Sequence, residues 1–205
     1  MSNTLKSIPI GKLLRAENSQ FVAGCRVKEL ETPAFGSLVK VRLEENTDIY
    51  GLITHILIND DSLVRQLVSG VSIPSEYTAD NRYNRNLPVE IHVLTIGFAQ
   101  NGVISHRLPP RPPLSLDHLF LCDQDDIRAF TAAGDHGYLR HILRLQDQPV
   151  EELLAAHLSQ AKPLHEKNGD FAWYGAACQK LITLLRDDYP RLTVVLDVLT
   201  ELERA

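Results

Sequence analysis

Three neighbouring residues, Ser115, Asp117 and His118, have the side chains of a hydrolase triad. A working triad needs a nucleophile, a base and an orienting acid that converge from separate elements, with oxyanion donors close by. Residues this close together in the chain do not provide that geometry. We therefore predict that Asp117 or Ser115 caps a turn, and that the chain has no catalytic site.

The eight histidines raise the question of a metal centre. His136 and His141 are five positions apart, which does not place them on one helical face, and Pro163 separates His157 from His165. No cysteine or carboxylate spacing completes a ligand set. We therefore predict no metal, no cofactor and a scattered, mostly surface set of histidines.

A cluster of arginines is the best candidate for holding a ligand. Arg65, Arg82 and Arg85 flank an irregular polar segment, and Tyr83 lies between the last two. Guanidinium groups bind carboxylates and phosphates through paired hydrogen bonds, so these four residues form a candidate ligand- or partner-binding site. Ion pairs with aspartates of the same loop would use the same arginines, and this alternative stays open.

A proline-rich segment divides the chain. Four prolines within five positions exclude a helix and disfavour sheet pairing, so we predict a semi-rigid polyproline-II strap over residues 107–120. The strap could bind an aromatic-lined groove, but a spacer that packs one domain against the other explains it better. Its main residues are Arg107, Pro109, Pro110, Arg111, Pro112 and Pro113. Its apolar neighbours are expected to pack into the seam between the domains: Leu108, Leu114, Leu116 and Leu119 to Leu121.

The sequence before the strap indicates β-strands. Residues 37–43 alternate between a buried apolar face and a wet face that carries Lys40 and Arg42. Residues 49–58 form a long apolar strand in which Gly51 predicts a bulge or tight bend that closes a barrel. Asn101-Gly102 predicts a hairpin, because both central positions of a type I′ turn need positive φ. With further strands at 8–14, 21–27, 88–98 and 103–106, six short strands predict a closed β-barrel over residues 1–106.

The sequence after the strap indicates helices. Asp123 is a good N-cap with Asp126 three residues later, and Pro149 stands in the first turn of a second long helix. Apolar residues recur at helical spacing as far as Leu202. The chain is therefore predicted to be of the α+β class, with an N-terminal six-stranded β-barrel followed by a C-terminal α-helical domain over residues 121–205.

Composition narrows the functional classes. The 205 residues carry a net charge of −5, and the 44% apolar and 23% charged residues are typical of a soluble globular protein. Before His106 there are 10 basic and 11 acidic residues, and after it 11 basic and 15 acidic, which disfavours binding to nucleic acid or anionic membranes. We find no signal peptide, no run of the roughly 18 apolar residues that a spanning helix needs, and no CxxC pair, so we expect a cytoplasmic protein.

The strand half resembles the HAS barrel, the small β-barrel shared by HerA-type ATPases and the catalytic-ring subunits of the ATP synthase. The residues that carry the likeness are 10–14, 21–27, Gly36 followed by 37–41, and 49–53 with Gly51 among aliphatic residues. The resemblance implies ring formation and partner docking. ATP hydrolysis is not implied, because the only Gly-Lys pair, Gly11-Lys12, lacks the upstream glycine and the following Ser or Thr of a phosphate-binding loop.

These observations predict a non-enzymatic assembly or adaptor protein. It is expected to dock through its barrel to a protein partner, such as a hexameric ATPase, or to a second copy of itself. The alternative is a nucleic-acid-associated accessory factor that uses the barrel rim, which the net charge disfavours.

Overall fold

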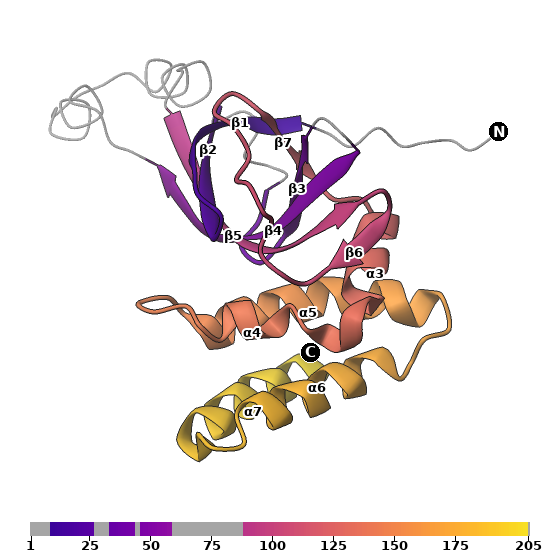
Figure 1. Cartoon of the computed structure of the whole chain (residues 1–205). Helices are drawn as coiled ribbons and strands as arrows, with labels where there is room; N and C mark the ends of the chain where they lie inside the picture. The colour runs from indigo at the N-terminus through magenta and orange to yellow at the C-terminus, as the bar shows by residue number, and fades with distance from the viewer. Residues whose placement is uncertain (1–8, 27–32, 44–45, 59–87, 205) are drawn as a thin grey trace, which may run out of the picture.

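The computed structural model describes residues 9–26, 33–43, 46–58 and 88–204 (Figure 1). Its antiparallel strands have the hydrogen-bonded order β2-β1-β7-β3-β4-β5-β6, and β2 also pairs with β5. That additional pairing closes all the strands except β6 into a barrel, which confirms the predicted six-stranded β-barrel. The strands are β1 (Pro9–Ala16), β2 (Gln20–Arg26), β3 (Leu38–Leu43), β4 (Thr47–Ile58), β5 (Pro88–Gln100), β6 (Val103–Ser105) and β7 (His118–Leu121).

The sixth strand of the barrel, β7, follows the prolines and begins at His118, within residues 107–120, the predicted strap. β7 lies between β1 and β3, where Leu119 is opposite Gly11 on one side and Val41 on the other. The strand predicted at 103–106 is β6, which pairs only with β5. It is the return strand of the predicted hairpin, in which Asn101 and Gly102 have φ values of 51° and 79°. The strap is therefore a connection between two strands of the same sheet.

The barrel is filled mostly by small and branched apolar side chains together with Phe21, and the absence of a side chain at Gly51 leaves room for them. The β4–β5 register shifts between Tyr50 and Gly51, so the predicted bulge is confirmed. A Cβ atom at Gly51 would lie 2.3 Å from Val93 Cγ1 and 3.3 Å from the ring of Phe21. The buried interior consists of Ile10, Leu13, Phe21, Ala23, Cys25, Val39, Val41, Ile49, Ile53, Val89, Ile91, Val93 and Leu119.

The described C-terminal residues are helical, and the predicted helical domain is confirmed. Asp123 and Asp126 form a reciprocal capping box at the start of the first helix, as the sequence predicts. In Figure 1, α4 and α5 lie next to the barrel, and α6 and α7 form a second layer beyond them. Within the described part of the chain, no helix is long and apolar enough to cross a membrane. The elements are α3 (Gln124–Ala132), the 3₁₀ turn η2 (Gly134–His136), α4 (Leu139–Ile142), α5 (Val150–Lys167), α6 (Trp173–Leu184) and α7 (Tyr189–Arg204).

A second core joins the outer wall of the barrel to the helices. Leu38, Leu52 and Ile96 of the barrel wall belong to the same buried cluster as the apolar faces of α4 to α7. Gly36, with φ 78°, allows the approach of α5: a Cβ there would lie 2.7 Å from the Cβ of Ala156. Because one continuous core links the two halves, we infer that they fold as one unit.

The wet face predicted for 37–43 is wrong at Lys40. Only 3% of this residue is exposed, and its Nζ lies 2.6 Å from the carboxylate of Asp126. The alternation of the strand is real, but α3 covers the outer face of β3 at this point. Because α3 is far from β3 in the sequence, its contact with the strand cannot be recognised from the residue pattern of the strand.

The prediction of mostly surface histidines is also wrong. Five of the eight are buried, all of them near or within the helical domain: His106, His136, His141, His157 and His165. Four of the five have a ring nitrogen within hydrogen-bond distance of a protein group. The strand histidines His55 and His92 are less buried and form an edge-on ring contact.

We expect the free energy of unfolding to fall steeply as the pH is lowered from about 6.5 towards 4. Burial is the largest influence on each buried histidine and lowers its pKa, in His157 to about 4. A lowered pKa means that the unfolded chain takes up the proton first, so the stabilisation is complete above the unfolded-state pKa and is lost below it. Denaturant unfolding at several pH values tests this: each proton taken up contributes about 1.4 kcal/mol per pH unit. A flat profile between pH 7 and 5 would contradict it.

Candidate docking surface

The strap lies along the barrel, starting at the end of β6 and leading to β7. The side-chain amide of Asn18, in the β1–β2 turn, donates to the carbonyl of Pro109 at 2.8 Å. Pro109 and Pro113 are buried against the barrel, whereas Arg107, Pro110 and Arg111 are exposed and Pro112 is half-buried. The strap is thus held against the barrel while it connects β6 to β7.

The predicted packing into the seam between the domains is wrong for Leu114, Leu116 and Leu119. Leu108, Leu114 and Leu116 are 41%, 71% and 72% exposed, while Leu119 is completely buried inside the barrel. Leu108 lines a pocket together with Ser19 of the barrel and Arg144 of the helical half, so the start of the strap does lie at the seam. Leu114 and Leu116 come later, in a turn that bonds to β1.

The residues of the suspected triad form a turn, as predicted. The carboxylate of Asp117 accepts from the backbone N–H of Leu114 at 2.8 Å, and the Ser115 hydroxyl donates to the Leu14 carbonyl at 3.2 Å. His118 is exposed on β7. These side chains are used for local and strand contacts and do not converge on a common point.

Leu116 has an unusual backbone conformation. Its φ is 74°, in the left-handed region that favours glycine or asparagine and is an outlier for a bulky residue. Its N–H donates to the carbonyl of Leu13 at 2.8 Å, which holds the turn against β1. A leucine in this region costs on the order of 1 kcal/mol, and its exposed side chain gains little by burial to offset that cost.

Leu14 is also placed on the surface by an irregularity. The β1–β2 register shifts between Leu13 and Arg15, so Leu14 is the extra residue of a bulge. Leu13 therefore points into the barrel, while Leu14 is 48% exposed and lies over Gly24 of β2. Two consecutive apolar residues in an alternating strand were the sequence signal for this bulge.

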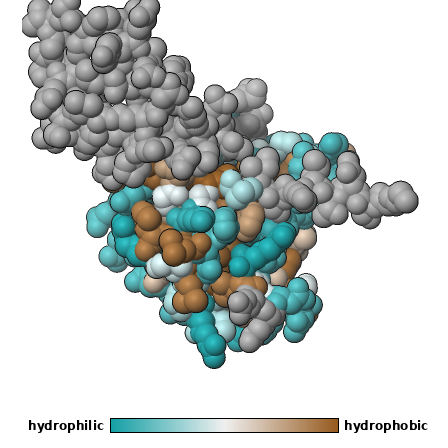
Figure 2. Space-filling model, turned by 90° about the horizontal axis from the view of Figure 1, so that it is seen from above, coloured by the Kyte–Doolittle hydropathy of each residue, from teal (hydrophilic) through white to brown (hydrophobic). Residues whose placement is uncertain are grey.

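We call Leu14, Leu114 and Leu116 the leucine surface. Because Ser115 and Leu116 bond to the backbone of residues 13–14, the three leucines belong to one small region of the barrel. Lys12 and Arg111 are exposed nearby in the sequence, and neither forms an ion pair with another described residue. Seen from the barrel side, the molecule shows hydrophobic patches set among hydrophilic side chains (Figure 2).

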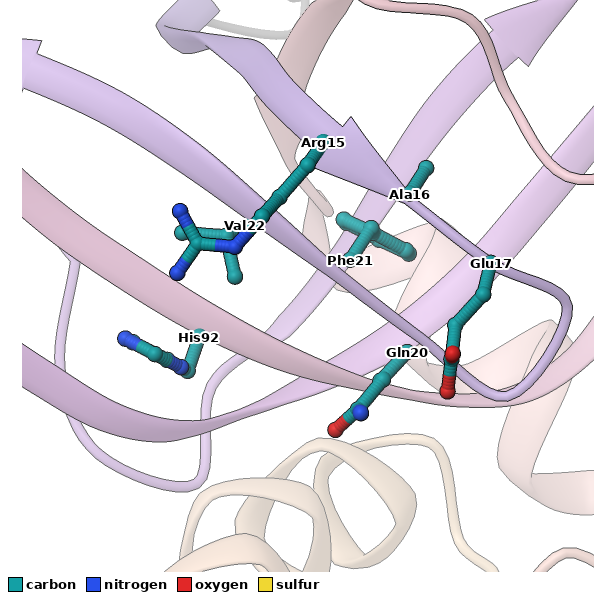
Figure 3. Close-up of a pocket in the computed structure, with 7 residues that line it drawn as sticks. All are labelled: Arg15, Ala16, Glu17, Gln20, Phe21, Val22 and His92. Atoms are coloured by element: carbon teal, nitrogen blue, oxygen red, sulfur yellow. The ribbon is translucent and has the colours of Figure 1, made fainter.

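A shallow pocket of about 350 Å³ lies beside the bulge (Figure 3). Arg15 and His92 are at one end, and Glu17 and Gln20 are at the other. Glu90 binds the Arg15 guanidinium at 3.0 Å and lies 3.6 Å from His92 Nε2. Partial burial lowers the pKa of His92 and outweighs the opposing effect of Glu90. The lining residues contain no nucleophile paired with a base, so the pocket does not support covalent catalysis.

The predicted arginine site cannot be placed. Arg65, Arg82, Tyr83 and Arg85 all lie outside the described residues. The described part of the chain contains no group of three or more histidine, cysteine or acidic side chains suited to a metal ion. Among the described residues, the leucine surface is the candidate site that we consider further.

Comparison with known protein families and with curated proteins finds no match to this chain.

Proposed function

We propose that the protein is a non-enzymatic adaptor that docks onto a protein partner through the leucine surface of its barrel. The observation that carries this proposal is the conformation of Leu116. A strained backbone holds a large apolar side chain in solvent, where it makes no compensating contribution to the fold. Strain of this kind is typical of positions whose side chain is kept for an interaction.

The shape of the leucine surface indicates what its partner provides. Leu114 and Leu116 are more than two-thirds exposed at the tip of a turn, so they protrude and do not line a groove. A protruding leucine is best buried in an apolar pocket of the partner, where it could act as an anchor of the interface. The exposed cations Lys12 and Arg111 favour carboxylates around that pocket.

A ring ATPase is the partner that we favour. The chain resembles the HAS barrel at Gly36 and Gly51, and both glycines have structural roles here, in the approach of α5 and in the bulge of β4. In that family the barrel forms rings and docks partners. The protein itself is not proposed to hydrolyse ATP, because Gly11-Lys12 lies within β1, whereas a phosphate-binding loop connects a strand to a helix.

Replacing Leu116 with glycine should weaken docking without lowering the free energy of unfolding. We expect the free energy of unfolding to stay unchanged or to rise by up to about 1 kcal/mol, since the left-handed strain is relieved and glycine adds some freedom to the unfolded chain. Recovery of the partner from native lysate should fall at least tenfold, which is about 1.4 kcal/mol. Denaturant unfolding and affinity capture with mass identification measure the two effects.

The matched control is Val194→Ser, which removes an exposed apolar side chain from α7, away from the barrel. It should leave capture unchanged. A loss of 2 kcal/mol or more in Leu116→Gly would mean that the leucine is part of the core. Equal capture by wild type and Leu116→Gly would remove the support for the leucine surface.

A further inference from the structure

The turn η2 between α3 and α4 has a rare conformation. Gly134, Asp135 and His136 have φ values of 56°, 50° and 52°, so the chain makes a short left-handed turn. The turn is closed by a 3.0 Å hydrogen bond from the N–H of Gly137 to the carbonyl of Gly134. Two of its three residues carry a Cβ and are strained in this region. Contacts with the rest of the molecule must therefore hold the turn in place.

His136 is the buried member of this turn, and it has the fewest hydrogen bonds of the described buried histidines. It is 7% exposed, its ring lies 5.5 Å from that of Trp173, and neither ring nitrogen has a hydrogen-bond partner among the described residues. The other four buried histidines each have a ring nitrogen close to a protein oxygen. A proton on His136 would thus be placed in an apolar site with no acceptor.

The titratable and charged groups around His136 include His106, which follows β6 and interacts with it electrostatically. Asp135 is on the same turn, His165 is on α5, Asp170 follows α5, and Lys180 is on α6. Burial lowers the pKa of His136, with His165 and Lys180 adding to that effect and the two aspartates opposing it. The side chains of Asp135 and Asp170 are 83% and 50% exposed, so the acids that would attract a charged ring lie at the surface.

The same turn holds the start of the strap. A Cβ at Gly134 would lie 3.0 Å from Nδ1 of His106, so the turn packs directly on this ring. The guanidinium of Arg140 donates both to the Gly137 carbonyl, at 2.8 Å, and to the His106 carbonyl, which also accepts from His141 Nε2 at 2.9 Å. The ion pair between Asp135 and Lys180, at 2.7 Å, ties the turn to α6.

We propose that this left-handed turn is a proton-operated catch: when His136 is protonated, the turn opens while the barrel and the long helices stay folded. The charged ring leaves its apolar site beside Trp173 and moves towards the surface carboxylates. Opening relieves the backbone strain and releases the contacts of Gly134 and Gly137 with His106 and Arg140. The first residue before the strap then loses part of its anchorage. This inference does not depend on the proposed docking.

Amide hydrogen exchange of the intact protein between pH 7 and 4.5 tests the catch, after correction for the intrinsic exchange rate. Opening that takes up one proton should increase the opening constant of the Gly137 amide by about tenfold per pH unit, over the range between the pKa of His136 in the open turn and its lower pKa in the closed turn. The barrel amides should exchange more slowly and follow only the pH dependence of global unfolding. Trp173 is the only tryptophan, and its emission should change over the same pH range, because the ring of His136 moves away from it.

His136→Asn should abolish the pH dependence of Gly137 exchange, because asparagine tolerates the left-handed conformation and does not take up a proton. His165→Gln is the control, since His165 stacks on Trp173 at 4.2 Å but is not on the turn, and the exchange of Gly137 should keep its slope. If His136→Asn does not fold, the wild-type exchange profile still decides. The catch is overturned if the slope persists in His136→Asn, or if the Gly137 amide of the wild type opens only together with the barrel amides.

Discussion

Gly51→Ala should destabilise the barrel by about 3 kcal/mol or more, and Gly51→Val by more than the alanine variant. A Cβ at this position would lie 2.3 Å from Val93 Cγ1 and 2.8 Å from the Leu94 carbonyl, well inside van der Waals contact. The obstacle includes backbone of the paired strand β5, so no rotamer change removes it. Denaturant unfolding of the purified variants measures the effect.

Gly175→Ala is the matched control for Gly51. This glycine is exposed in the first turn of α6, and a Cβ there would meet nothing within 4 Å. Alanine should stabilise the protein by up to about 1 kcal/mol, because it has the higher helix propensity. An unchanged denaturation midpoint in Gly51→Ala would show that β4 and β5 are not paired as described, and that the barrel closes in another way.

Asp126→Ala should destabilise the protein by about 3–5 kcal/mol. The change leaves the ammonium of Lys40, whose side chain is 4% exposed, without the carboxylate that lies 2.6 Å from it. It also removes the acceptor for the N–H of Asp123 in the capping box of α3. Thermal or denaturant unfolding of Asp126→Ala beside wild type checks this value.

Two further variants separate the buried charge from the loss of a surface carboxylate. Asp125→Ala removes the neighbouring acid, which is 86% exposed and pairs with Arg128, and should change stability by less than about 0.5 kcal/mol. The double variant Lys40→Met with Asp126→Ala removes both charges and should recover most of the loss. If the double variant is as unstable as Asp126→Ala, the unpaired charge is not the cause.

The features predicted correctly from sequence are those whose signal lies within a few residues. Asn101-Gly102 specifies its hairpin by conformation, Asp123 and Asp126 specify a capping box, and Gly51 interrupts an otherwise branched apolar strand. Each depends on local chemistry and is little affected by distant packing. The α+β architecture follows from them.

The features missed depend on contacts between distant parts of the chain. β7 has only four residues and follows the strap, so it shows no alternation long enough to recognise, and its pairing with β1 and β3 is entirely non-local. Lys40 has the residue type of a surface position, and its burial is caused by α3. The buried histidines were likewise judged by residue type, although a neutral imidazole with a hydrogen-bond partner is compatible with a core.

The leucine surface was missed for a different reason. The sequence was expected to bury the leucines of the strap, because apolar residues flanking a spacer normally fill a seam. Leu116 adopts a backbone conformation that glycine and asparagine favour, so its residue type does not predict it. The bulge at Leu14 is indicated only by the fact that Leu13 beside it is also apolar. The left-handed backbone of Leu116 and the bulge at Leu14 each leave a leucine side chain exposed, and this supports a role of these leucines in binding.

A photo-crosslinking amino acid at position 116 tests the docking of the leucine surface most directly. After irradiation of cells that express the full chain, we predict a discrete adduct with one protein partner, and competition for it by the unlabelled wild-type chain. The same group at position 194 on α7 should give no such adduct. Adducts of equal yield at both positions, or none at position 116 above background, would contradict the claim that this surface binds a partner.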